Sequence, residues 1–370
     1  MGAYTTIDDP SAHFHIQLYT GTGSSHSVTN DANAGDFKPD WVWIKERSSS
    51  GGHKTYDSTR GVQKTLQTQS TATETTTAQG LTAFNTDGFT VGSDGGHNQN
   101  SATYVAWQWK ANGGTTSSNS DGNITTTLQT NSTAGFTIGT YTGAGSSPDN
   151  KTIGHGLGAI PDLVIIKGRD GSGAGGAAQY WIVGAPNTTL FGNGGNKHLF
   201  LGGTQALMDN STIWRSANFT STTIPLGGHA ALNSSGAAYV FYAFKNIQGY
   251  SKISQYVGNG NSGNTGAFVF TGFKPNFVML RETGNSNSWW MFDTKRDPFN
   301  TADARFAANS SDAEATGSFT DVVNFLSNGF KIKNSDSAWN RSGGTYIYMA
   351  FAENPFVTSD DGGSIPTTAR

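Results

Sequence analysis

The sequence predicts an all-β protein built from three tandem β-sandwich domains of related sequence, of jelly-roll or lectin-like type. Two observations predict this class. One set of sequence blocks recurs three times in the same order. Aromatic residues also reach 12% of the 370 residues and charged residues only 13%, while glycine contributes 49. Aromatic and β-branched residues between glycine-rich turns favour many short strands, which is typical of sandwiches.

The repeat has three blocks, and its copies lie roughly 115–120 residues apart, close to the size of one domain. The first block is a turn that ends at Gly23, Gly145 and Gly260. The second block is a strand that follows a proline, in KPDWVWIKER (38–47), IPDLVIIKGR (160–169) and KPNFVMLRET (274–283). The third block is an aromatic strand, in SATYVAWQWK (101–110), GAAYVFYAFK (236–245) and GGTYIYMAFA (343–352). The chain is therefore expected to be three copies of one domain rather than one large enzyme.

The domain boundaries follow from composition. We expect the first sandwich, with a short N-terminal segment, at residues 1–111, followed by a polar, Gly- and Ser-rich linker at 112–123. The second sandwich spans 124–247 and the third 248–356, with no polar linker between them. Residues 357–370 form a polar tail that we expect to be flexible. The N-terminal segment and the first sandwich are expected to be the docking end, with the segment adding a strand to a partner's sheet.

Local patterns predict individual elements. In the first proline block Trp41, Trp43 and Lys45 share one face of a strand, so we expect one face in the core and the other partly exposed. Residues 81–92 predict a hairpin with a turn at Asp87-Gly88. Helices are expected to be scarce, with one or two turns at residues 301–309 as the best candidate.

Composition also excludes several classes of protein. The net charge is −3 without any basic run, so nucleic-acid binding has little electrostatic support. Cysteine is absent, which excludes disulfides and thiol catalysis. No apolar run is long enough to span a membrane, and the N-terminus has no Sec-type signal, so we expect neither membrane insertion nor secretion by that route. We expect no cofactor.

Two of the three copies carry an aspartate and an arginine three residues apart, Asp57 with Arg60 and Asp293 with Arg296. The corresponding stretch of the second copy lacks both. A catalytic role needs an acid and a base in an enclosed pocket, whereas an ion pair that fixes a turn needs only proximity. We therefore interpret these pairs as structural.

A cation recurs at one strand position, as Lys45, Lys167 and Arg281. Such a group could bind a ligand carboxylate. We expect instead that its stem covers an aromatic ring while its charged end stays in water.

Metal sites have weak support in the sequence. His13 and His15 share one strand face and could form a site on the axis of a trimer, but two strand histidines are the simpler interpretation. The acidic loops at Asp94 and Asp121 are better interpreted as turns than as calcium sites. We therefore predict no metal.

Exposed aromatic residues are the best binding signal. Trp289, Trp290 and Trp339 are candidates for contact with a glycan or a protein partner, because flat rings stack on sugar faces and anchor protein interfaces. The alternative is that these rings fill the sandwich cores.

Taken together, ten segments resemble the repeated β-domain of virion structural proteins in marine tailed bacteriophages: TTIDDPSAHF, LYTGTG, KPDWVWIKER, YDSTRGV, AFNTDGFTVG, TYVAWQWKANGGTT, GHGLGAIP, QGYSKISQYVGNG, FLSNGFKI and TYIYMAFAENP. The resemblance covers nearly the whole chain. It implies a non-enzymatic particle component, and no catalytic residue is carried over from it.

The expected function is therefore that of a surface-exposed virion protein, as a head decoration or knob, a tail fibre or a tail tip. It would be made in the host cytoplasm, form a homo-oligomer, and contact other virion proteins and a host-surface glycan. The alternative is a lectin-like carbohydrate-binding protein with Trp-lined loops. A glycan-degrading enzyme is disfavoured, because no pair of carboxylates recurs.

Overall fold

The computed structural model describes residues 5–31, 37–145, 151–171, 179–186, 190–191, 196–214, 218–317 and 321–356. Over these ranges the regular structure is nearly all β, arranged in several sheets, as the sequence predicts. The helices are single turns of three or four residues. Within the same ranges, no helix has the length and hydropathy needed to cross a membrane.

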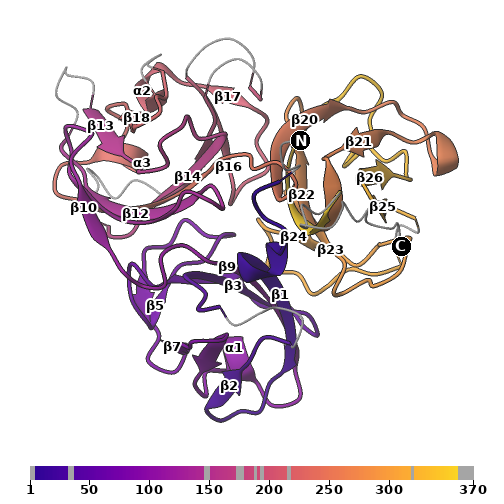
Figure 1. Ribbon diagram of the computed structural model, residues 1–370, viewed down its shortest axis with the longest axis horizontal. Helices are drawn as coiled ribbons and strands as arrows, with labels where there is room; N and C mark the ends of the chain where they lie inside the picture. The colour runs from indigo at the N-terminus through magenta and orange to yellow at the C-terminus, as the bar shows by residue number, and fades with distance from the viewer. Residues whose placement is uncertain are drawn as a thin grey trace.

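The first lobe contains β1 to β9 and is drawn in indigo to purple in Figure 1. Its large sheet has the order β1-β9-β3-β4, and its smaller sheets have the orders β2-β8-β7 and β5-β6. The elements are η1 (Pro10–Ala12), β1 (Phe14–Thr20), β2 (His26–Val28), β3 (Trp41–Glu46), β4 (Lys54–Asp57), β5 (Lys64–Thr65), β6 (Thr75–Thr76), β7 (Leu81–Phe84), β8 (Phe89–Val91), α1 (Gly95–Asn98) and β9 (Thr103–Trp109).

The second lobe contains β10 to β19. Its large sheet has the order β10-β11-β12-β19-β14-β15-β16-β17, and β13 pairs with β18 separately. The elements are β10 (Ser117–Asn119), β11 (Thr126–Asn131), β12 (Phe136–Thr142), β13 (Lys151–Gly154), β14 (Leu163–Gly168), β15 (Trp181–Gly184), β16 (Lys197–Phe200), β17 (Met208–Asp209), α2 (Ser211–Trp214), β18 (Thr223–Leu226), α3 (Ala230–Asn233) and β19 (Ala238–Phe244).

The third lobe contains β20 to β27, in orange to yellow in Figure 1. Its large sheet has the order β20-β27-β22-β23-β24, and its smaller sheet the order β21-β26-β25. The elements are β20 (Ser251–Val257), η3 (Gly263–Thr265), β21 (Phe268–Phe270), β22 (Phe273–Glu282), β23 (Trp290–Asp293), β24 (Phe306–Ala307), β25 (Val323–Leu326), β26 (Gly329–Ile332) and β27 (Thr345–Pro355).

The three lobes surround a common centre (Figure 1). One hydrophobic core, here called the central core, takes residues from the large sheets of all three lobes. Aromatic rings join each pair of lobes within it, with centroids 4.4 Å apart for Trp41 and Tyr242, 4.9 Å for Phe14 and Phe351, and 6.1 Å for Phe244 and Phe351. Each lobe also has its own core on the other face of its large sheet.

Both faces of the large sheets are therefore buried. All six residues of β3 are buried, and so are all six of the equivalent strand β14. The expectation that one face of this strand lies in the core while the other is partly exposed is therefore wrong. One face of β3 packs into the central core, while Val42 and Ile44 pack into the core of the first lobe.

The repeated glycine turn makes the same contacts in each lobe. The N–H of Gly23, Gly145 and Gly260 donates to the carbonyl oxygen of Asn98, Asn233 and Asn340, at 2.8, 3.0 and 2.9 Å. These glycines have φ of 71°, 87° and 70°, in the region that favours glycine. A pair of stacked tyrosines adjoins each turn, always with centroids 4.9 Å apart: Tyr19 with Tyr104, Tyr141 with Tyr239, and Tyr256 with Tyr346.

The remaining predictions concern a hairpin, a helix, the linker and the tail. The hairpin at residues 81–92 is confirmed, since β7 and β8 pair on either side of Gly88. The helix expected at 301–309 is wrong, because that stretch contains β24. Three residues of the expected linker form β10, which pairs with β11 and so belongs to the second lobe's sheet. The expected flexible tail, residues 357–370, lies outside the described residues.

The N-terminal segment is tied into the chain itself from Thr5 onward. Thr5 Oγ1 donates to the carbonyl oxygen of Gln248 at 2.6 Å, and Ile7 is buried in the central core. The described part of this segment is therefore used within the molecule, which differs from the expectation that it adds to a partner's sheet.

Candidate functional site

Two of the three candidate tryptophans lie inside the protein. Trp289 is 2% exposed in the central core, and Trp339 is 0% exposed in the core of the third lobe. The expectation that they are exposed is wrong, because Trp289 is covered by the other lobes in the central core and Trp339 fills the core of its own lobe. Trp290 is half-buried, packs edge-to-face on Trp339, and its Nε1 donates to Asn287 Oδ1 at 3.2 Å.

Trp289 belongs to a set of three equivalent contacts between lobes. Trp289 Nε1 donates to the carbonyl oxygen of Phe200 in the second lobe at 2.8 Å. Trp181 Nε1 donates to that of Gln67 in the first lobe, also at 2.8 Å. His53 of the first lobe completes the set through the carbonyl oxygen of Ala307 in the third lobe at 3.1 Å.

The protonation of His53 follows from its partners. Its Nδ1 accepts from Trp43 Nε1 at 2.8 Å, so Nε2 carries the proton and donates to Ala307. Burial, and then the charge of Lys45, hold the pKa of His53 well below its usual value, so the ring is neutral. The third lobe thus donates a ring N–H to the second, the second to the first and the first to the third. The three contacts form a closed ring.

The predicted Asp–Arg pairs are present as buried ion pairs. The distances from Arg Nε to Asp Oδ2 are 2.5 Å for Arg60 with Asp57 and 2.6 Å for Arg296 with Asp293, and all four side chains are fully buried. Each aspartate also accepts a hydrogen bond from the next lobe around the ring. Asp57 accepts one from the Tyr242 hydroxyl at 2.7 Å, and Asp293 one from the Trp107 indole at 3.1 Å.

A glutamate extends each pair across the junction. Glu74 binds Arg60 of its own lobe at 3.0 Å and Arg169 of the second lobe at 2.9 Å. Burial alone raises the pKa of Glu74, but the hydrogen bonds and charges of the two arginines outweigh it and lower the pKa. Glu314 makes the matching contacts with Arg296 and Arg47, at 3.1 and 2.8 Å. These carboxylates and arginines thus form ion pairs with one another, and the pairs that cross a junction hold the lobes together.

The recurring cations do not extend into water. Lys45, Lys167 and Arg281 are each 0% exposed, which contradicts the expectation of a hydrated charged end. Lys167 Nζ donates to the carbonyl oxygen of Gln179 and lies 3.5 Å from that of Ser70 in the first lobe. Arg281 donates to the carbonyl oxygens of Phe200, Gly203 and Gln205 in the second lobe.

Burial changes the acidity of these groups. It lowers the pKa of Lys167 to about 7 and that of Lys45 to about 8. Only part of Lys167 is therefore charged at neutral pH. The charged ends, rather than the stems, are what lies over aromatic rings, since Lys45 Nζ lies 4.8 Å from the centre of the Phe306 ring and Lys167 Nζ 5.8 Å from that of Trp181.

The metal candidates serve other purposes. His13 packs against Tyr250 of the third lobe and hydrogen-bonds Asn131 of the second. Asp94 caps α1 through the N–H of Gly96, and Asp121 bonds Asn119. In the ranges that the structure describes, no group of three or more His, Cys, Asp or Glu side chains could hold a metal ion.

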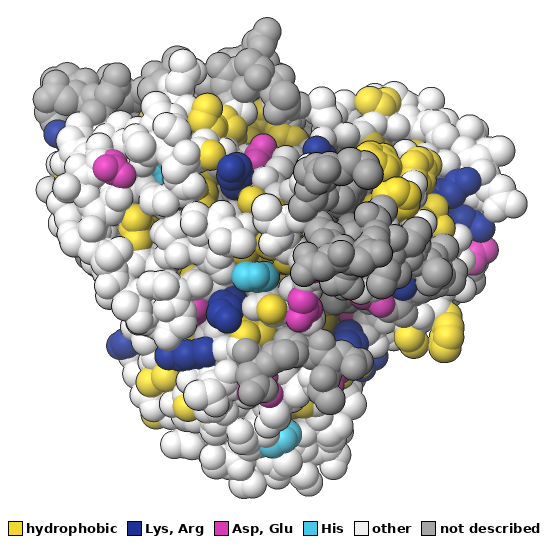
Figure 2. Space-filling model, in the orientation of Figure 1, with side chains coloured by type: hydrophobic (Ala, Val, Ile, Leu, Met, Phe, Trp, Pro, Cys, Tyr) yellow, Lys and Arg dark blue, Asp and Glu magenta, His cyan; other side chains and the backbone are white. Residues whose placement is uncertain are grey.

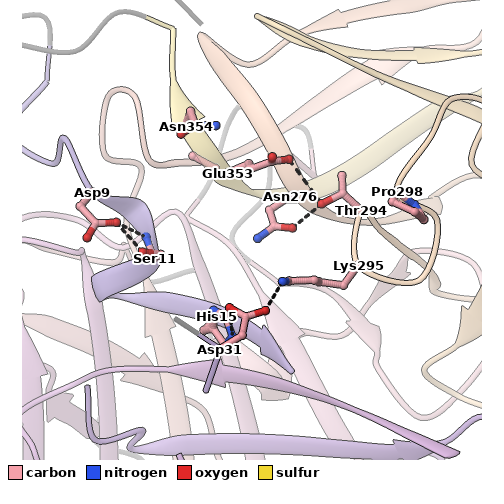
Figure 3. Close-up of a pocket in the computed structure, with 11 residues that line it drawn as sticks. Asp9, Ser11, His15, Asp31, Asn276, Thr294, Lys295, Pro298, Glu353 and Asn354 are labelled. Atoms are coloured by element: carbon pink, nitrogen blue, oxygen red, sulfur yellow. Dashed lines mark hydrogen bonds and ion pairs between the residues drawn. The ribbon is translucent and has the colours of Figure 1, made fainter. Parts of the chain in front are cut away.

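A polar cleft of about 510 Å³ lies between the first and third lobes (Figure 3). The first lobe contributes residues of η1, His15 of β1 and Asp31. The third contributes Thr294, Lys295 and the ends of β22 and β27. The lining residues are Asp9, Ser11, His15, Asp31, Asn276, Thr294, Lys295, Pro298, Ala352, Glu353 and Asn354.

An ion pair crosses this cleft. Lys295 Nζ contacts Asp31 Oδ2, and His15 Nε2 lies 3.6 Å from Asp31 Oδ1 (Figure 3). Burial lowers the pKa of His15 and outweighs the opposing effect of Asp31. Thr294 Oγ1 donates to Asn276 Oδ1 at 2.5 Å. The lining thus contains hydrogen-bond donors and acceptors together with positive and negative side chains. This suits a polar ligand such as a polypeptide backbone.

Sequence reasoning missed the aromatic rings that are exposed. Phe268 and Phe270 on β21 are 49% and 60% exposed, and Phe299 is 81% exposed. The alternation in the FVF triplet places both phenylalanines on one face and the buried Val269 on the other, but it does not say which of the two faces meets a core. The surroundings are otherwise polar and little charged. Figure 2 shows a face on which most of the described surface is neither charged nor hydrophobic side chain, with charged side chains singly or in small groups.

Comparison with known proteins places the chain in a family. The model of a family described as a domain of unknown function (DUF7483) matches residues 9–355, and so spans all three lobes in one match. No curated protein and no solved structure matches the chain. Because the match covers most of the sequence, the chain belongs to the family described as domain of unknown function DUF7483.

Proposed function

We propose that the chain is a non-enzymatic structural protein of a bacteriophage particle, made of three copies of one β-sandwich unit. The observation that carries the proposal is the closed set of contacts from His53, Trp181 and Trp289 to equivalent carbonyl groups of the preceding lobe. Such a chain builds a rigid block with its loops on the outside, and loops positioned by a rigid scaffold often carry binding residues. The sequence resemblance to phage virion proteins supports the same role.

The ionisable groups fit this role as well. The buried Asp57 and Asp293 and the half-buried Glu74 and Glu314 are each bound by arginine, and an acid or base held in this way is poorly suited to proton transfer. The arrangement of these carboxylates and arginines instead supports a role in joining the lobes. In this proposal the chain is made in the host cytoplasm and sits on the virion surface as a head decoration or a tail fibre component. Its partners are other virion proteins, further copies of itself and a host-surface glycan.

Mass spectrometry of purified phage particles tests the proposal. The chain should be found at a fixed stoichiometry relative to the major capsid protein after density-gradient purification and a high-salt wash. Its absence from washed particles, while present in the infected lysate, would contradict the proposal.

Carbohydrate binding is the second candidate, and the partly exposed ring of Trp290 favours it. The buried positions of Trp289 and Trp339 weaken it, because they remove two of three stacking surfaces. A glycan array distinguishes the two functions. Binding that is lost on Trp290→Ala and kept on Phe299→Ala would establish the lectin role.

A further inference from the structure

The second lobe has a pocket of about 320 Å³ beside β16 and β17. The ring of Tyr180 stacks on Phe200 with centroids 4.5 Å apart, and His198 packs edge-to-face on Phe200 at 5.3 Å. Met208 of β17 and Ile213 of α2 complete the apolar part of the lining. None of the residues that the structure places around this pocket is aspartate, glutamate, lysine or arginine. A pocket lined in this way suits an uncharged ligand with apolar faces.

Two histidines of the lining each have one ring nitrogen without a hydrogen-bond partner among the described residues. His198 Nδ1 donates to the carbonyl oxygen of Asn196 at 3.4 Å, so its Nε2 is left as an acceptor. His229 Nδ1 accepts from the N–H of Ala231 at 3.1 Å, so its Nε2 carries the proton and is left as a donor. Burial lowers the pKa of both rings, which keeps them neutral at neutral pH. One hydroxyl group of a ligand can donate to the first ring and accept from the second.

In the first lobe the equivalent position already binds a tyrosine hydroxyl. Thr65 and Arg305 are the equivalents of His198, because each of the three lies two residues before the carbonyl group that accepts a ring N–H across a junction. Thr65 Oγ1 donates to the Tyr56 hydroxyl at 2.7 Å, and His97 Nε2 contacts the same hydroxyl at 2.6 Å. An aromatic hydroxyl therefore lies between this strand position and a histidine ring.

In the third lobe the same position contacts two tryptophans. The guanidinium carbon of Arg305 lies 5.9 Å from the centre of the Trp290 ring and 5.7 Å from that of Trp339. Ile182 is the equivalent of Trp290, since each directly follows the tryptophan whose indole N–H crosses to the preceding lobe. Its smaller side chain lies in the core of the second lobe. The second lobe thus has a pocket beside His198, where the other two lobes place aromatic side chains of their own.

We propose that this pocket binds a tyrosine side chain of another protein. The phenol ring packs against Tyr180 and Phe200, while its hydroxyl donates to His198 Nε2 and accepts from the Nε2–H of His229. Aromatic rings favour stacked and edge-to-face contacts, and a buried tyrosine hydroxyl needs a hydrogen-bond partner, so the lining meets both requirements. The identity of the partner, another particle protein, rests on the proposed function, whereas the chemistry of the pocket does not.

N-acetyl-tyrosinamide is the probe, and the isotope-labelled methyl group of Met208 in the intact chain is the reporter, identified by its loss in Met208→Leu. The ring current of the bound probe should shift the Met208 methyl signal in NMR spectra, while the signals of Met279 and Met291 in the central core stay unmoved. N-acetyl-phenylalaninamide lacks the hydroxyl and should bind about tenfold more weakly. Equal affinities of the two probes, or no shift of Met208 up to the solubility limit of the tyrosine probe, would overturn the proposal.

Two matched variants locate the hydroxyl contact. His198→Leu removes the acceptor and keeps an apolar side chain, so the two probes should bind it with equal affinity. His26→Leu, at a partly buried histidine of the first lobe, should keep the preference for the tyrosine probe. Unchanged signals of Met279 and Met291 show that each variant is folded. A preference that persists in His198→Leu, or a Met208 shift caused by methyl glycosides and not by the tyrosine probe, contradicts the assignment. Because the test uses the purified chain, it can fail while the chain is still found in particles.

Discussion

At the scale of single residues, buried charged side chains join the lobes. The free energy of unfolding should depend on them. Lys167 is the clearest case, because its ammonium group is fully buried against carbonyl oxygens and lies 5.8 Å from the centre of the Trp181 ring. Desolvation lowers its pKa from 10.5 to about 7. Folding therefore favours loss of this proton at neutral pH.

Lys167 predicts how stability depends on pH. The folded pKa lies below the unfolded one, so the unfolded chain binds more protons between pH 7 and 10, and the free energy of unfolding rises with pH over that range. Relative to Lys167→Met, the wild type should gain on the order of 3 kcal/mol between pH 7 and 10. Urea unfolding of both proteins across this range measures the difference. Parallel pH profiles would show that Lys167 has an ordinary pKa in the folded protein.

The Asp–Arg pairs make a second prediction. Asp293→Ala leaves the buried Arg296 without its closest carboxylate and the Trp107 indole without its acceptor, so unfolding free energy should fall by about 3–5 kcal/mol. The control is Asp312→Ala, an exposed aspartate in the same lobe, which should change stability by less than about 0.5 kcal/mol. Equal effects of the two substitutions in denaturant titrations would contradict the structural role.

At the scale of elements, the glycine turn and its tyrosine pair are the most repeated structure. The hydroxyls of Tyr19, Tyr141 and Tyr256 donate to the carbonyl oxygens of His97, Leu232 and Trp339, at 2.7, 2.7 and 2.6 Å. Each hydroxyl therefore fixes the loop that precedes the aromatic strand of its lobe.

Because these three tyrosine hydrogen bonds are equivalent, removing any one of them should lower the free energy of unfolding by the same amount. Tyr19→Phe, Tyr141→Phe and Tyr256→Phe each remove one buried hydrogen bond and take a donor from a buried carbonyl oxygen, so each should lower unfolding free energy by about 1–2 kcal/mol. Chemical denaturation of the three variants measures the costs. One variant with no effect would show that its lobe does not use the turn as the others do. Tyr180→Phe, at a partly exposed ring, is the neutral control.

The strands could be predicted at this scale, and the sequence also held a signal for the faces they bury. The recurring blocks around Trp41, Leu163 and Phe277 indicate equivalent strands, and they occupy equivalent places in the three large sheets. Their apolar runs WVWI (41–44), LVII (163–166) and FVML (277–280) are continuous rather than alternating, which is typical of strands buried on both faces. The cleft could not be predicted, since Asp31 and Lys295 are brought together from distant parts of the sequence.

At the scale of the whole molecule, the central core makes the three lobes depend on one another. The first lobe contributes Phe14, Trp41 and Trp109 to a core that the other two lobes complete. A fragment of residues 1–111 should therefore expose these rings, bind the dye ANS and self-associate. The full chain, prepared in parallel, should bind little dye. A fragment that stays monomeric and unreactive to the dye would show that the first lobe folds independently.

The most direct measurement is differential scanning calorimetry of the intact chain. If one shared core joins the three lobes, a single transition is expected, with a ratio of van't Hoff to calorimetric enthalpy of about 1. Three resolved transitions, or a ratio of about one third, would show that the lobes unfold separately and would contradict the account.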